Sequence, residues 1–345
     1  MNILVTGSEG YIGMRLTPWL AARGHRVTGL DSGYYRDGTL YLDPIGLPEL
    51  PRTLYKDLRT VTPADFEGFE AVIHLAELSN DPLGEHCPDV TFEINHQGTL
   101  RIAKAAREAG VKRLVYASSC SVYGAAVTDF VDETSPVNPQ TAYAQCKTLV
   151  ERDLKAMADE NFTVVFLRNA TAYGPSPRMR FDIVLNDLCA LAWTQHKISM
   201  ISDGSPWRPI VHIEDICEAL RCALEAPSNT VNGEVYNVGN SSENYRIREI
   251  AEIIASVFTG CEVTTGLPSG DNRSYRVCFD KIATCLPGFK ARWTAKEGAI
   301  ELKQLFERIQ MPQSMYEFRA FTRLKQLTYL QRTGQLDQNL YWSAR

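Results

Sequence analysis

Short apolar runs alternate with longer amphipathic stretches through the first half of the chain. The short runs predict buried strands at residues 2–6, 26–30, 71–76, 113–117 and 162–167. The longer stretches predict helices at about residues 13–23, 91–109 and 140–160. Alternating strands and helices favour an α/β fold, a doubly wound and mostly parallel sheet covered by helices.

The pattern becomes less regular after Arg168. Loops rich in glycine and proline, at residues 174–177, 203–209 and 267–270, alternate with short helical stretches. We therefore expect a smaller lobe at residues 168–310, placed to bind the substrate.

The rest of the chain divides around this lobe. An N-terminal domain is expected at residues 1–167, and residues 210–240 are expected to return to it. Residues 311–345 form a predicted helical extension, in which apolar residues such as Phe321 and Leu324 recur about one turn apart. Such a helix suits packing on the body of the protein or on a neighbouring subunit.

Composition excludes several classes of protein. The net charge of −5 over 345 residues gives no polybasic field for nucleic acid or for an anionic membrane. No apolar run approaches the ~20 residues that span a bilayer, and the start MNILVTG lacks the features of a signal peptide. Nine cysteines are scattered without the spacing of a metal site, which favours a reducing cytoplasm and no metal.

The first predicted strand leads directly into the motif G-x-x-G-x-x-G, formed by Gly7, Gly10 and Gly13. These glycines permit a tight turn, a close approach of a diphosphate to the backbone, and close packing of helix on sheet. Free N–H groups at the start of the helix favour an anion. Asp31 ends the second strand, where a carboxylate accepts hydrogen bonds from an adenosine ribose and repels a 2′-phosphate. The sequence therefore predicts a Rossmann-type dinucleotide site that prefers NAD to NADP.

Tyr143 and Lys147 stand four residues apart on a predicted helix and therefore share a face. An ammonium group beside a phenol favours the phenolate, which is a general base for a substrate hydroxyl. Ser119 ends the preceding strand, on the side of a parallel sheet where ligands bind. We expect Ser119 to hold the same substrate oxygen from which Tyr143 takes the proton.

The ordered motifs of the chain resemble those of the extended short-chain dehydrogenase/reductases, and within these the NAD-dependent nucleotide-sugar epimerase/dehydratase branch. The motifs are Asp31 and the segments TGSEGYIG (6–13), DL (57–58), HLAE (74–77), INHQGT (94–99), SSCSVYG (118–124) and YAQCK (143–147). The resemblance covers about residues 1–300. It implies the catalytic roles of Ser119, Tyr143 and Lys147. It also implies a set of cofactor-binding residues, namely Gly7, Gly10, Tyr11, Ile12, Gly13, Asp31, Asp57, Leu58, Leu75, Ala76, Ser79, Asn95, Tyr143 and Lys147.

The second lobe carries further matches. The segment WRPIVHIED (207–215) implies that Arg208 contacts the substrate diphosphate. The segment GDNRSYRV (270–277) implies that Arg273 lies near the nucleotide of the substrate. Asn186 and Thr171 lie where relatives place groups that contact the substrate. The resemblance also implies a homodimer formed through the helices at 91–109 and 140–160.

Departures from the family pattern reduce the number of reactions that the resemblance allows. Sugar 4,6-dehydratases carry Asp-Glu just after the catalytic Ser/Thr, whereas this chain has Cys120 and Ser121. Many 4-epimerases have an asparagine at the position of Thr171. The segment 173–187 is similar to a subgroup that includes GDP-heptose 4-dehydrogenases.

These observations favour NAD-dependent oxidation at C4 of a nucleotide-activated sugar, by an epimerase or a 4-dehydrogenase. A 4-ketoreductase or a sugar dehydratase of the same family is an alternative, and a catalytically silent NAD-binding protein is a more distant one.

Overall fold

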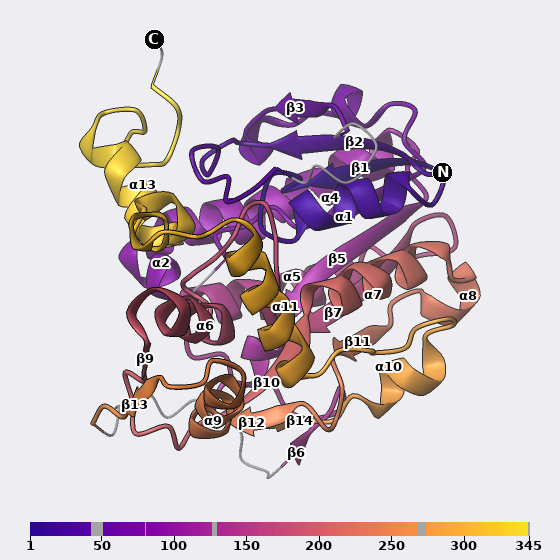
Figure 1. The fold of residues 1–345 in the computed structure, drawn as a ribbon. Helices are drawn as coiled ribbons and strands as arrows, with labels where there is room; N and C mark the ends of the chain where they lie inside the picture. The colour runs from indigo at the N-terminus through magenta and orange to yellow at the C-terminus, as the bar shows by residue number, and fades with distance from the viewer. Residues whose placement is uncertain (43–50, 80, 126–129, 268–273, 344–345) are drawn as a thin grey trace.

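The computed structural model describes the chain except residues 43–50, 80, 126–129, 268–273 and 344–345 (Figure 1). Its centre is a seven-stranded sheet with the order β11-β7-β5-β4-β1-β2-β3, in which every pair of neighbouring strands is parallel. The strands are β1 (Asn2–Thr6), β2 (Arg26–Asp31), β3 (Thr53–Tyr55), β4 (Ala71–His74), β5 (Arg113–Ser119), β7 (Thr163–Asn169) and β11 (Val235–Val238). The predicted α/β fold class is confirmed.

Helices cover both faces of this sheet because its strands are apolar on both sides. Ile3 and Val5 of β1 face one hydrophobic cluster, whereas Leu4 between them faces another. Helices α1 (Gly13–Ala21) and α7 (Ile213–Glu225) pack on the first face. The π-helical segment η3 (Phe92–Gly98), α4 (Thr99–Glu108) and α5 (Ala142–Lys155) pack on the other.

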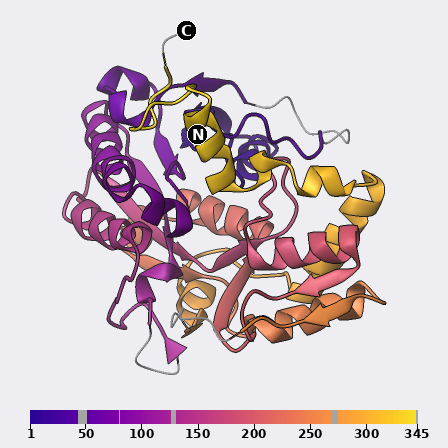
Figure 2. The same cartoon turned by 90° about the vertical axis from the view of Figure 1, so that its left-hand side faces the viewer.

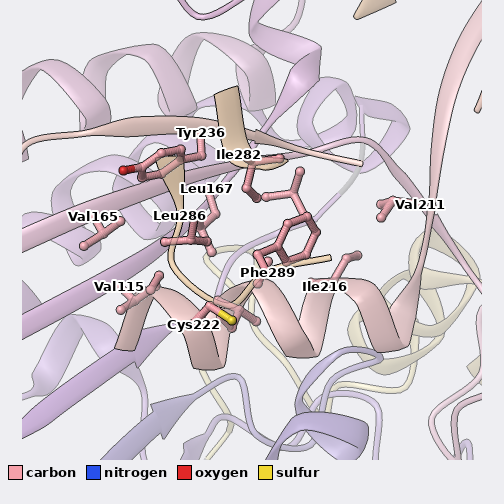
Figure 3. Close-up of a cluster of buried hydrophobic side chains, with 14 of the residues drawn as sticks. Val115, Val165, Leu167, Val211, Ile216, Cys222, Tyr236, Ile282, Leu286 and Phe289 are labelled. Atoms are coloured by element: carbon pink, nitrogen blue, oxygen red, sulfur yellow. The ribbon is translucent and has the colours of Figure 1, made fainter. Parts of the chain in front are cut away.

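Figure 3 shows part of the first cluster. Val115 of β5 and Leu167 of β7 lie opposite Ile216 and Cys222 of α7. Phe289, which follows α10 (Asp280–Cys285), closes the cluster from the C-terminal half of the chain. Segments far apart in the sequence therefore share one core.

Outside the central sheet, the described chain also forms smaller sheets, and three longer helices follow or flank their strands in sequence. A three-stranded sheet has the order β12-β10-β8, and two further sheets pair β13 with β9 and β14 with β6. The strands are β6 (Phe130–Val131), β8 (Thr171–Tyr173), β9 (Lys197–Ser199), β10 (Trp207–His212), β12 (Asn244–Arg246), β13 (Glu262–Thr264) and β14 (Arg276–Val277). The helices are α6 (Val184–Gln195), α9 (Ile247–Val257) and α11 (Ala295–Arg308).

Short helical segments complete the described chain. They are η1 (Leu58–Thr60), η2 (Pro63–Phe66), α2 (Asp81–His86), α3 (Pro88–Thr91), η4 (Cys120–Tyr123) and α8 (Ser228–Val231). No helix in the described part of the chain has the length and apolarity needed to cross a bilayer.

The helical extension predicted at residues 311–345 does not form one continuous helix. It forms α12 (Gln313–Tyr316), η5 (Arg319–Phe321) and α13 (Arg323–Arg332), because Phe318 and Thr322 between them have extended backbone. Leu327 and Leu330 of α13 join the hydrophobic cluster on the second face of the sheet. The extension lies beside α2 and the N-terminal half of the sheet (Figures 1 and 2).

Candidate active site

A cavity of about 480 Å³ opens at the carboxyl ends of the central strands. Its walls include Asp31 at the end of β2, Ala76 after β4, Ser119 at the end of β5 and Asn169 at the end of β7. Thr171 of β8, in the three-stranded sheet, also lines the cavity. Ligands of open parallel sheets bind at this edge.

The turn between β1 and α1 forms one wall, and its glycines have no room for side chains. Gly7 has a φ of +70°, which favours glycine. A Cβ on Gly13 would lie 2.2 Å from the Gly7 carbonyl oxygen, and one on Gly10 would lie 3.1 Å from the same atom. The backbone therefore lines the cavity directly at the start of α1, where unpaired N–H groups suit the diphosphate of a dinucleotide.

Two carboxylates mark the end of the cavity that suits an adenosine. Asp31 is buried and accepts hydrogen bonds from the N–H groups of Glu9 (3.0 Å) and Gly33 (2.7 Å). Asp57 accepts a hydrogen bond from the backbone N–H of Arg59 (2.8 Å) and pairs with its guanidinium (2.6 Å). The two N–H groups hold the Asp31 carboxylate at the end of β2, where its charge repels a 2′-phosphate, and this agrees with a site for NAD.

Ser119, Tyr143 and Lys147 line the opposite end of the cavity. Thr141 caps α5 by accepting a hydrogen bond from the N–H of Ala144 (3.2 Å), which fixes the start of the helix that carries Tyr143. The Ser119 hydroxyl oxygen accepts a hydrogen bond from the N–H of Ser121 (3.1 Å). Its hydroxyl proton therefore remains available for a substrate oxygen.

Lys147 has a charge partner that the sequence did not suggest. Its Nζ lies 2.6 Å from Oε2 of Glu77 and also donates to the Ala117 carbonyl. The Glu77 carboxylate accepts a further hydrogen bond from the Tyr116 hydroxyl (2.6 Å). Burial disfavours the charged lysine, but the Glu77 carboxylate outweighs that effect and raises the pKa of Lys147. The ammonium beside Tyr143, whose ring centroid lies 5.4 Å from Nζ, is therefore held in place and charged.

Cys120 does not have the environment of a base. Its side chain is buried, its Sγ lies 3.2 Å from the Arg168 carbonyl oxygen to which it donates, and burial raises the pKa of the thiol. Ser121, the next residue, lines the cavity.

Most of the predicted ligand-binding residues meet in this one cavity. They are Gly7, Gly10, Tyr11, Ile12, Gly13, Asp31, Asp57, Leu58, Leu75, Ala76, Ser79, Ser119, Tyr143, Lys147, Thr171 and Arg208.

Two predicted contact residues lie outside the cavity wall instead. Asn95 is fully buried and binds the backbone N–H (2.8 Å) and carbonyl (3.0 Å) of Leu78, so it braces the loop after β4. Asn186 is fully buried and accepts from the N–H of Gly174 (3.0 Å), so it braces the loop after β8. Arg273 lies outside the described residues.

Several cavity residues carry no recognisable motif. Tyr34 and Tyr35 follow Asp31, Arg180 and Asp182 precede α6, and Arg323 begins α13. The sequence contains no motif for these residues. Charged residues are seldom buried without a partner, and this gives only an indirect signal of their role.

Comparison with known proteins gives the family. Residues 3–239 match the NAD dependent epimerase/dehydratase family, and the chain therefore belongs to it. It is an NAD-dependent enzyme that acts on nucleotide sugars.

Relatives within this family catalyse different reactions. A UDP-glucose 4-epimerase of Bacillus subtilis is 28% identical over 334 residues, which cover 88% of this chain and 94% of the relative. A dTDP-glucose 4,6-dehydratase of Streptomyces niveus is 28% identical over 314 residues, which cover 87% of this chain and 91% of the relative. The structure of MoeE5 in complex with UDP-glucose and NAD is 27% identical, with a TM-score of 0.76, and the match covers 90% of this chain and 100% of that one. Equal identity to an epimerase and to a dehydratase leaves the reaction to be argued from the site.

Proposed function

We propose that the enzyme oxidises C4 of a nucleotide-activated sugar without eliminating water, as an epimerase or a 4-dehydrogenase. The observation that carries this proposal is the cavity that brings Ser119, Tyr143 and Lys147 together with no free carboxylate among its described residues. Bound NAD supplies the hydride acceptor. Arg208, which lines the same cavity from β10, is the proposed contact for the substrate diphosphate.

The three residues have distinct roles in this proposal. Tyr143 takes the proton from the C4 hydroxyl as a general base. Ser119 donates its hydroxyl proton to the same oxygen and orients it. Lys147 keeps a positive charge beside Tyr143, which stabilises the phenolate, and binds the ribose next to the reacting ring of the cofactor.

Elimination of water from the sugar needs an acid or a base near C5 and C6, in addition to the C4 oxidation. The cavity's described carboxylates are all engaged elsewhere. Asp31 and Asp57 lie at the adenosine end, Glu77 binds Lys147, and Asp182 binds Arg180 at 2.8 Å. Next to Ser119, the chain has a buried thiol and a hydroxyl in place of carboxylates. This arrangement favours oxidation without dehydration.

The fate of the 4-keto sugar distinguishes the reactions that remain possible for the enzyme. Return of the hydride to the other face of C4 gives epimerisation, which we favour slightly. Release of the ketone gives a net dehydrogenation, and the reverse reaction is that of a 4-ketoreductase. Thr171 lines the cavity at the position of the epimerases' asparagine, so the protein differs from many epimerases at a wall of the site.

The proposal is tested in two stages. First, UDP-, GDP-, dTDP- and CDP-sugars are screened for thermal stabilisation of the NAD-loaded protein, because a ligand of the native state raises the melting temperature. UDP-glucose, the sugar bound in MoeE5, is the first to screen. Second, the stabilising sugar is incubated with the protein and with a Tyr143→Phe control, and the product is identified by NMR and mass spectrometry. A C4 epimer or a 4-keto sugar supports the proposal, and a product lighter by one water molecule contradicts it.

A further inference from the structure

Arg323 is an unusual residue for the wall of a cavity. It begins α13 in the C-terminal extension, and only 2% of its surface is exposed. Its guanidinium carbon lies 4.0 Å from the centroid of the Tyr35 ring. Its Nη1 atom is buried and has no hydrogen-bond partner among the described residues.

The carboxylates near Arg323 do not neutralise the positive charge of its guanidinium. Asp182 is the nearest candidate carboxylate, but its Oδ1 binds Nε of Arg180 (2.8 Å) and its Oδ2 accepts the backbone N–H of Arg323 (3.0 Å). Arg178 lies 3.8 Å from Glu9, so Glu9 is engaged as well. No carboxylate of the described residues forms an ion pair with the Arg323 guanidinium. Burial and the neighbouring Arg180 lower the pKa of Arg323 to about 10. A buried cation without a counter-charge is costly for the free protein.

The position of this uncompensated positive charge in the cavity indicates which anionic group of a ligand it would bind. Arg180 donates to the Ser79 hydroxyl (3.2 Å) and interacts electrostatically with both Tyr35 and Tyr143. Arg180 thus reaches the loop after β4, and Arg323 lies over Tyr35 on the loop after β2. The Gly7 turn after β1 lies between these two loops, because the strand order is β4-β1-β2. In NAD the diphosphate joins the two nucleosides and carries two negative charges. Guanidinium groups match such oxygens in geometry and charge.

We propose that Arg323, together with Arg180, binds the diphosphate of NAD, so that the C-terminal extension is a working part of the cofactor site. The extension is attached to the same loop through other contacts. The Gln326 amide donates to the Tyr34 carbonyl (3.0 Å), and the Trp342 indole donates to the Ser32 carbonyl (2.7 Å). These bonds position α13 so that Arg323 reaches the cavity.

The test is the affinity of purified protein for NAD, for ADP-ribose and for UDP, measured by calorimetry. Arg323→Met removes the charge and keeps the length of the side chain, whereas Arg332→Met removes an exposed arginine from the same helix and is the matched control. We expect Arg323→Met to weaken NAD and ADP-ribose alike by about 10–100-fold, the usual range for a charge-assisted hydrogen bond to phosphate. UDP affinity and the control are expected to change less than about twofold.

A second readout separates binding from a structural role. Because Arg323 is uncompensated in the free protein, Arg323→Met is expected to melt at the same temperature as the wild type or higher when no ligand is present. A lower melting temperature would indicate an arginine that holds the fold together. Arg323→Lys keeps a charge in the site and loses the fork geometry, so it is expected to weaken NAD by about 3–10-fold. The proposal would be overturned if Arg323→Met bound NAD as tightly as the wild type, or if it lost affinity for UDP and not for NAD.

Discussion

Glu77 offers a sharp test of how the active site holds its lysine. Glu77→Gln keeps the shape of the side chain and an oxygen that can face Lys147, but removes the negative charge. The ammonium is then left in a buried position with the neutral amide and the Ala117 carbonyl as partners. We expect the variant to be less stable and Lys147 to lose part of its proton affinity.

The size of the effect follows from the geometry. At 2.6 Å and an effective dielectric constant of ~20, the Coulomb attraction between the two groups is about 6 kcal/mol. Relief of the desolvation of Glu77 returns roughly half of this, so the net loss is about 2–4 kcal/mol. An unfolding entropy of ~2.1 cal/mol/K per residue gives about 0.7 kcal/mol/K for the 345 residues of the chain. Divided by this entropy, the loss of about 2–4 kcal/mol in stability corresponds to a fall of about 3–6 °C in melting temperature.

The assay is a double-mutant cycle in urea, with Glu77→Gln, Lys147→Met and the double variant. Each single variant leaves one buried group without its partner, whereas the double variant leaves neither. We expect the double variant to be more stable than the sum of the single effects predicts by about 2–3 kcal/mol. Glu108→Gln, at an exposed position, is the matched control and is expected to change stability by less than about 0.5 kcal/mol. Additive effects of the two single variants within about 0.5 kcal/mol would refute the reasoning.

Three further predictions concern the cofactor, the base and a buried carboxyl. Asp31→Asn removes the charge that repels a 2′-phosphate. Calorimetry should therefore show that the variant binds NAD about 10-fold more weakly than the wild type and binds NADP no more weakly. An unchanged preference for NAD would contradict this role of Asp31. Tyr143→Phe should lower turnover by about 10²–10⁴-fold while NAD affinity changes less than about twofold, and a variant that keeps most of its activity would mean that another group is the base. Burial raises the pKa of Asp187 to about 6 in the folded state, against ~3.9 in the unfolded chain, so its stabilising contribution is complete below about pH 4 and is lost as the pH rises through 6. Asp187→Asn keeps an acceptor for the Tyr316 hydroxyl and should therefore be more stable than the wild type by about 3 kcal/mol at pH 8, with the difference vanishing near pH 4. A constant difference across this range would rule out the titration of Asp187 as its source.

The sequence predicted five of the seven central strands, namely β1, β2, β4, β5 and β7, because they contain apolar runs that are largely buried. It missed the short strands β3 and β11. Runs such as Ala71–His74 are apolar whichever way their side chains point, and short apolar runs of this kind are typical of parallel strands. The turn at Gly7 was equally predictable, since its glycines are adjacent in sequence to the strand and helix that they join. Local signals therefore sufficed for the cofactor turn and for the helix of Tyr143 and Lys147.

The parts of the site that escaped prediction depend on contacts between distant segments. Glu77 and Lys147 are 70 positions apart, and they meet because β4 pairs with β5 and α5 packs on β5. Asn186 has the residue type of a ligand contact, but the folded chain uses its amide to brace the backbone at Gly174. Arg323 looks like a surface residue of an amphipathic helix, yet it is buried because the extension packs beside α2 and against the loop after β2. Such contacts have no periodic pattern along the chain.

The most direct test of the central claim follows the hydrogen on C4. The nucleotide sugar that stabilises the NAD-loaded protein is prepared with deuterium at C4, and the label is located by NMR and mass spectrometry after turnover. Oxidation at C4 without dehydration predicts that the label returns to C4 of a diastereomer of unchanged mass, or appears on the reduced cofactor beside a 4-keto sugar. A product that has lost one water molecule and carries the label at C6 would contradict the claim and identify a 4,6-dehydratase.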